Sequence, residues 1–199
     1  MSTIGACRVH VYRDLFPSSR CLFMYRDIVA VAKSSYRMFL VQPSLRLAYV
    51  LGHISANVVK TAVESLGFDG SNWRVRVNDG LMPGVLTAAL KMTSYLDLRR
   101  RGFDISAVRY EDLVARPLDM CRVLLDFCHL PQSLAVLAVR AFDVDSQRDS
   151  PLAKSAIGHL QAPELTPQRK RKLNELLKKF DKMPLIGEPS IIEGTLSCS

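Results

Sequence analysis

The feature that most constrains the fold is a short apolar run, CLFMY at 21–25, which is followed at once by Arg26 and Asp27. Five residues that are apolar on both faces are typical of a strand inside a parallel sheet, where helices cover both sides. Asp27 is a good N-cap for a helix through IVAVAKSSYRMF, a stretch that is apolar nearly all round and is therefore predicted to be buried. A strand that leads directly into a buried helix indicates an α/β unit.

The rest of the chain continues this pattern. A second strand is predicted at 104–110, where DISAVRY precedes a Glu-Asp pair. Between the strands we expect helices at roughly 43–66 and 82–101, and WRVRV at 73–77 is a candidate for a short strand. Two further helices are expected, one from Pro117 and one from Pro131 to about Phe142. A polar loop over 143–165 then precedes a basic helix that begins at Thr166 and Pro167. Strands alternating with helices predict an α/β fold with right-handed crossovers onto a parallel sheet.

Parallel sheets bind ligands beyond the carboxyl ends of their strands, which directs attention to Arg26 and Tyr110. A guanidinium gives phosphate a bidentate charged pair, and Ser34, eight residues on, adds a hydroxyl. On these residues alone a second interpretation is equally open. In that interpretation Arg26 pairs with a surface carboxylate and Ser34 is a small packing residue.

The strand, the Arg-Asp pair and a small-residue helix with serine eight positions after the arginine resemble the 3′-phosphate motif of the PAPS-dependent sulfotransferases. The preceding VYRDLFPSSR resembles the stretch that leads into this strand in that family. The resemblance implies that Arg26 and Ser34 bind the 3′-phosphate of the adenosine 3′,5′-bisphosphate moiety of PAPS (3′-phosphoadenosine 5′-phosphosulfate).

A second block, AVRYEDLVARPLDMCRVLLDFCHLP, resembles the same family's strand, Tyr-Glu-Asp-Leu, proline-started helix and Leu-Pro ending. It implies that Tyr110 lies on the adenine side of the site, where a flat ring and a hydroxyl suit a purine. We interpret Glu111 and Asp112 as structural residues that cap a turn or pair with Arg109.

A third, looser match lies in RDSPLAKSAIGHLQAPELTP, where Lys154 precedes Gly158 by four residues. Cytosolic sulfotransferases close their nucleotide site with an Arg-Lys-Gly, two residues, Gly-Asp-Trp pattern. Most of its positions differ here, including His159 and Leu160 in place of Asp and Trp. Lys154 is the candidate 3′-phosphate contact, Arg148 is a rival, and a solvent-facing loop is the alternative.

The loop that holds the 5′-phosphosulfate in this family is missing from the sequence. No glycine begins a Gly/Ser/Thr-rich loop, since Gly80 and Gly84 are too closely spaced and lead into Val85. The expected fold is therefore a three-layer parallel sheet of the P-loop nucleoside-triphosphate-hydrolase-like type that lacks its first strand and phosphate loop. We expect one partial sulfotransferase-like domain over 1–199, with a core at about 8–182 and a tail at 183–199. We expect a fragment, a shortened form, or a descendant that has lost transfer activity.

The implied reaction transfers a sulfuryl group from PAPS to a hydroxyl or amine acceptor, with no metal. The alternative is a non-catalytic nucleotide-binding or interaction protein derived from the same fold. No catalytic residue is assigned. His10 falls between the two phosphate motifs, where cytosolic sulfotransferases carry a histidine, but its neighbouring residues do not match the family's. His53, His129 and His159 have no partner spacing that suggests other chemistry. The Tyr-Glu-Asp-Leu block and the absence of a lysine-bearing loop argue against a kinase.

The net charge of +8 favours anionic partners, but +5 of it comes from residues 168–182. That segment also has leucines and a phenylalanine at helical spacing, so it predicts a surface helix with a solvated basic face, and no nucleic acid is expected as a partner.

The cysteines show no metal-binding spacing. Two of them help to give the helix after Pro117 an apolar face, which consists of Leu118, Cys121, Leu124, Leu125 and Cys128. No apolar run reaches the roughly 18 residues of a membrane span. Cytoplasmic localisation is the default expectation, with the Golgi as the alternative if an N-terminal anchor precedes this chain.

Overall fold

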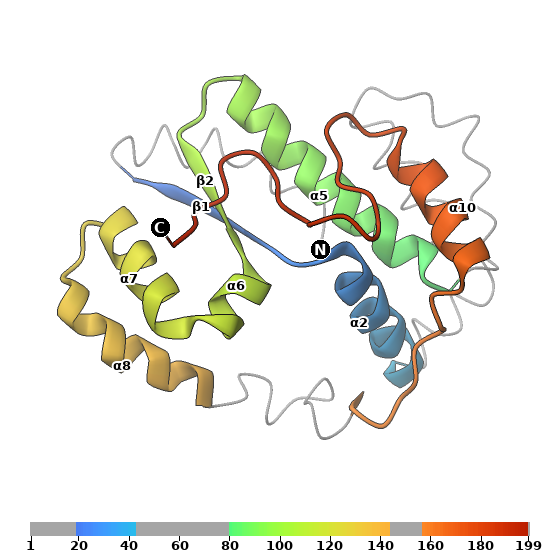
Figure 1. The fold of residues 1–199 in the computed structure, drawn as a ribbon, viewed down its shortest axis with the longest axis horizontal. Helices are drawn as coiled ribbons and strands as arrows, with labels where there is room; N and C mark the ends of the chain where they lie inside the picture. The colour runs from blue at the N-terminus through green and yellow to red at the C-terminus, as the bar shows by residue number, and fades with distance from the viewer. Residues whose placement is uncertain (1–18, 43–79, 144–156, 199) are drawn as a thin grey trace.

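The two predicted strands pair with each other in parallel. The computed structural model describes residues 19–42, 80–143 and 157–198. In this part of the chain, β1 (Cys21–Tyr25) and β2 (Ile105–Arg109) form a two-stranded sheet whose register runs from Cys21 opposite Ile105 to Tyr25 opposite Arg109. The strands cross the middle of the molecule, and helices lie around them (Figure 1). The α/β class predicted from the sequence is confirmed.

The helices begin close to the predicted positions. Their bounds are α2 (Ile28–Val41), α5 (Met82–Arg100), α6 (Tyr110–Ala115), α7 (Pro117–Phe127), α8 (Ala135–Val139) and α10 (Pro167–Leu177). The single helix expected from Pro131 to Phe142 is instead α8 between two 3₁₀ turns, Gln132–Leu134 and Arg140–Asp143. The short helix α6 was not predicted. The elements expected at 43–66 and 73–77 lie outside the described residues.

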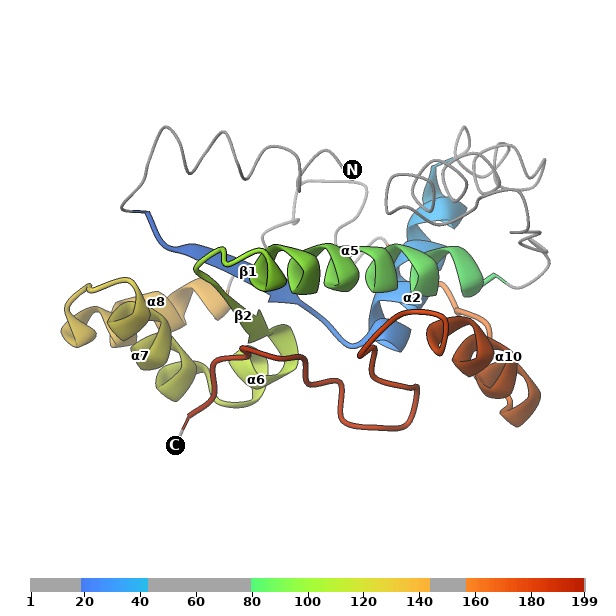
Figure 2. The same ribbon diagram turned by 90° about the horizontal axis from the view of Figure 1, so that it is seen from above.

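The main core forms where α5 crosses α2 beside the sheet. Most residues of α5 are buried, and Figure 2 shows this helix extending from the sheet to α10. The closest approach is at Gly84, where a Cβ atom would lie only 2.5 Å from the Cα of Ala32. Gly84 therefore has a packing role between two helices.

The strand β1 and the helix α2 are less buried than predicted. Leu22 and Met24 expose one face of the strand, while Tyr25 is buried. In α2 only Ile28 and Ala32 are buried, and the other side chains are partly exposed. The expectation that both faces of β1 are covered is therefore not met.

A smaller apolar cluster joins β2 to α6 and α7 through Val108, Leu113 and Met120. The predicted face of α7 is only partly correct. Cys121 is buried as expected, but Cys128 is exposed, and the fully buried Met120 lies outside the predicted stripe.

The basic helix α10 has the predicted surface position. Thr166 caps it by accepting a hydrogen bond from the amide of Arg169 at 3.3 Å. Its apolar stripe, Leu173, Leu176, Leu177 and Phe180, is buried. Within residues 19–42, 80–143 and 157–198, no helix is both long and apolar enough to cross a membrane.

The C-terminal segment, 183–198, packs into the core and does not extend away as a tail. Met183, Ile186 and Ile192 are buried in the main cluster. Thr195 forms a parallel bridge with Ala107, since the Ala107 amide donates to Gly194 at 2.9 Å and the Leu196 amide donates to Ala107 at 2.8 Å. The segment returns along the molecule to β2, as its dark red trace in Figure 1 shows.

Candidate functional site at the strand ends

The register of the sheet brings the sequence blocks around Arg26 and Tyr110 together. Tyr25 and Arg109 are the last paired residues, so Arg26 and Tyr110 leave the sheet at the same level. The Arg26 guanidinium carbon lies 5.0 Å from the centroid of the Tyr110 ring, which is cation–π distance. Both side chains are accessible, with 46% of Arg26 and 38% of Tyr110 exposed. The expectation that Arg26 and Tyr110 lie at the carboxyl ends of parallel strands is thus confirmed.

Glu111 connects the residues at these strand ends. Its Oε1 accepts a hydrogen bond from the Asp27 amide at 3.1 Å and lies 3.6 Å from Arg26 Nε. Its Oε2 lies 3.5 Å from Arg109 Nε. Arg109 also pairs with Asp112 at 3.8 Å. The interpretation of Glu111 and Asp112 as partners of Arg109 is confirmed, and the pairing of Arg26 with a carboxylate is also observed.

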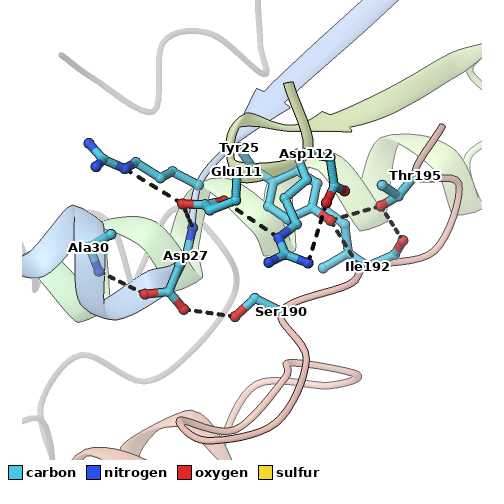
Figure 3. Close-up of polar contacts among 10 residues, drawn as sticks. Tyr25, Asp27, Ala30, Glu111, Asp112, Ser190, Ile192 and Thr195 are labelled. Carbon is cyan, nitrogen blue, oxygen red and sulfur yellow. Dashed lines mark hydrogen bonds and ion pairs between the residues drawn. The ribbon is translucent and has the colours of Figure 1, made fainter. Parts of the chain in front are cut away.

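Asp27 anchors the start of α2 as predicted, and it also contacts the C-terminal segment. Its Oδ1 accepts from the Ala30 amide at 2.8 Å, which satisfies one of the free N–H groups at the helix start. Its Oδ2 accepts from the Ser190 hydroxyl at 3.0 Å. Figure 3 shows Asp27 between these two partners, with Glu111 close above it. Ser190 is the only buried polar residue in the part of the chain that the structure describes.

A closed set of hydrogen bonds holds the C-terminal segment beside Tyr25. The Ile192 amide donates to the Tyr25 hydroxyl at 3.4 Å, and the Tyr25 and Thr195 hydroxyls are 2.9 Å apart. Thr195 Oγ1 donates to the Ile192 carbonyl at 2.6 Å, so its single proton is used there and the Tyr25 hydroxyl donates to it. Figure 3 shows the three residues side by side.

Of the other predicted site residues, only Ser34 belongs to the part of the chain that the structure describes. Ser34 lies partly exposed in the second turn of α2, six residues after the first residue of the helix, or about 9 Å along its axis. No hydrogen bond joins it to Arg26 among the described residues. Lys154, its rival Arg148, and His10 lie outside those residues.

Sequence reasoning missed Ser190 and Thr195, because they lie in a segment with no helical or strand periodicity. Two prolines and two glycines between 183 and 195 are typical of a loop, and nothing local indicates that this loop returns to the strand ends.

The chemistry that the strand ends offer is binding by charge and by ring stacking. Two guanidiniums, three carboxylates and one phenol lie there, without a histidine among the described residues in contact with them. Within the described ranges, no group of three or more His, Cys, Asp or Glu side chains is arranged to hold a metal ion.

Comparisons with protein families, with curated proteins and with solved structures give no match to this chain.

Proposed function

We propose that the chain binds the adenosine 3′,5′-bisphosphate portion of PAPS at the strand ends, within a P-loop-like three-layer fold. The observation that supports this most is the convergence of Arg26 and Tyr110, which come from sequence blocks more than eighty residues apart. A half-exposed guanidinium and a half-exposed aromatic ring side by side suit a ligand with a phosphate and a purine.

In this proposal Arg26 binds the 3′-phosphate and Tyr110 packs on the adenine. Ser34 and Lys154 are further candidate contacts by the same resemblance. Asp27, held by Ala30 and Ser190, fixes the point at which the chain turns from β1 into α2.

The complete reaction would transfer a sulfuryl group to a hydroxyl or amine acceptor. It needs a backbone loop around the 5′-phosphosulfate, and the sequence has no glycine-rich stretch for that role. Non-catalytic nucleotide binding is therefore the second candidate function. Incubation with sulfur-35-labelled PAPS and a panel of phenol, alcohol and amine acceptors distinguishes the two, because only an enzyme yields a labelled product.

Calorimetry with adenosine 3′,5′-bisphosphate tests the binding itself. We expect Arg26→Ala to abolish measurable binding, since charged hydrogen bonds to phosphate contribute about 1.5–3 kcal/mol each. The matched control is Arg122→Ala, which removes an equally exposed arginine that pairs with Asp119 on α7. Adenosine 5′-monophosphate should bind much more weakly, because it lacks the 3′-phosphate. Equal affinity of wild type and Arg26→Ala would remove Arg26 from the site and contradict the proposal.

A further inference from the structure

The Glu111 carboxylate occupies the position at the strand ends that is best suited to an external anion. Three positive or donor groups surround it: the Asp27 amide at 3.1 Å, Arg109 Nε at 3.5 Å and Arg26 Nε at 3.6 Å. A backbone N–H beside two guanidiniums is a favourable environment for phosphate. We propose that Glu111 is an internal competitor, which fills this anion site when it is empty and must withdraw before a phosphate group binds.

The balance of charge at the site supports competition. Arg26 and Arg109 bring two positive charges, and Asp27, Glu111 and Asp112 bring three negative charges. With Glu111 in place, the net charge is therefore negative and a phosphate dianion is repelled. Asp27 and Asp112 have other partners, whereas Glu111 is the carboxylate that pairs with Arg26 among the described residues.

The contacts of Glu111 are weak enough to exchange. Both of its ion-pair distances exceed the 2.7–2.9 Å of a strong charged hydrogen bond. Its Oε2 and Arg109 Nε are buried atoms without a hydrogen-bond partner in the described residues. The side chain begins in the first turn of the short helix α6 and is partly exposed, so a rotamer change can carry its carboxylate into solvent.

Substitution of Glu111 distinguishes a carboxylate that competes with phosphate from one that holds Arg26 in its binding position. In Glu111→Gln the side chain keeps an oxygen for the Asp27 amide but loses its charge. We expect this variant to bind inorganic phosphate and adenosine 3′,5′-bisphosphate about tenfold more tightly than wild type, because the charge it removes lies a few ångströms from the ligand. The opposite role, in which Glu111 holds Arg26 in its binding position, predicts weaker binding.

Asp112→Asn is the matched control. It removes the same charge from the same cluster, but Asp112 contacts Arg109 and not Arg26. An affinity gain in Glu111→Gln that exceeds the gain in Asp112→Asn and disappears in the double variant with Arg26→Ala supports the inference. Equal gains in the two single variants would mean general electrostatics and would overturn it, as would unchanged or weaker binding in Glu111→Gln.

The nucleotide in this inference rests on the proposed function, and inorganic phosphate separates the two. If Glu111→Gln gains affinity for inorganic phosphate but adenosine 3′,5′-bisphosphate binds no better than phosphate, the internal competitor stands and the nucleotide proposal fails. If wild type binds the nucleotide through Arg26 and Glu111→Gln gains no affinity, the nucleotide proposal stands and the internal competitor fails.

A measurement on the unsubstituted chain covers the case in which Glu111→Gln does not fold. The nitrogen-15 resonance of Arg26 Nε should shift on saturation with phosphate as its carboxylate partner is exchanged, and the Arg109 Nε resonance should shift with it. An unchanged Arg26 Nε resonance at saturating phosphate would overturn the inference.

Discussion

Replacing Gly84 with alanine tests how closely α2 and α5 pack. A Cβ at this position would lie 2.5 Å from the Cα and 3.2 Å from the Cβ of Ala32. Because the nearest atom belongs to the backbone of α2, a rotamer change cannot relieve the contact and the helices must move apart. Overpacking of this kind typically costs about 1–3 kcal/mol, and a clash with backbone belongs at the upper end.

Alanine also stabilises the helix itself, by about 1 kcal/mol relative to glycine. The difference between the two terms predicts a net loss of about 2 kcal/mol. For a chain of this length that corresponds to a decrease in Tm of about 4–8 °C. Urea denaturation followed by circular dichroism measures the free energy of unfolding, and thermal scans measure the Tm.

Two results would refute this reasoning about the contact at Gly84. If Gly84→Ala is as stable as wild type or more stable, helix propensity outweighs the contact, and the helices are not as close as the structure places them. The double variant Ala32→Gly/Gly84→Ala should not recover the loss, because the Cα of residue 32 remains. Full recovery would show that the two side chains, and not the backbone, set the distance between the helices.

Two other predictions concern the C-terminal segment and a buried thiol. Tyr25→Phe should lower the free energy of unfolding by about 1–2 kcal/mol, because Thr195 and the Ile192 amide lose the hydroxyl that they share. Hydrogen exchange at the Leu196 amide should become faster. Unchanged exchange would contradict the closed set of hydrogen bonds beside Tyr25. Burial raises the pKa of the Cys121 thiol, so iodoacetamide at pH 8 should modify the exposed Cys128 before it modifies Cys121. The unfolded chain loses the Cys121 proton at lower pH than the folded chain, so this thiol's contribution to stability should decline as the pH rises above its ordinary pKa, and Cys121→Ala should remove that part of the decline.

The elements that the sequence predicted are those with strong local signals. The run at 21–25 and the cap at Asp27 needed no knowledge of their neighbours, and the prolines at 117 and 167 marked helix starts that the structure has. The helix beginning at Met82 was expected at roughly 82–101, and its Pro83 stands in the first turn, where proline is tolerated. Each of these signals acts within a few residues.

The missed features depend on contacts between distant segments. Met120 is fully buried because β2 and Cys198 lie against α7, although it lies outside the expected apolar stripe. Segment 183–198 joins the core through buried residues without periodic spacing and through hydrogen bonds to Tyr25 and Asp27. Such contacts leave no repeating pattern, so propensity and spacing do not predict them.

The candidate site is a consequence of strand register more than of any one residue. Residues on a strand alternate between its faces, so a shift of one residue would turn the side chains of β2 to opposite faces. It would place the buried Ala107 and Val108 differently, separate Arg26 from Tyr110, and remove Glu111 from the Asp27 amide. The same register also presents Ala107 to Thr195, which lets the C-terminal segment bring Ser190 to Asp27. Burial of β2 and the geometry of the proposed anion site are therefore fixed together. A substitution that lets the register slip should abolish phosphate binding even when Arg26 and Glu111 are both intact.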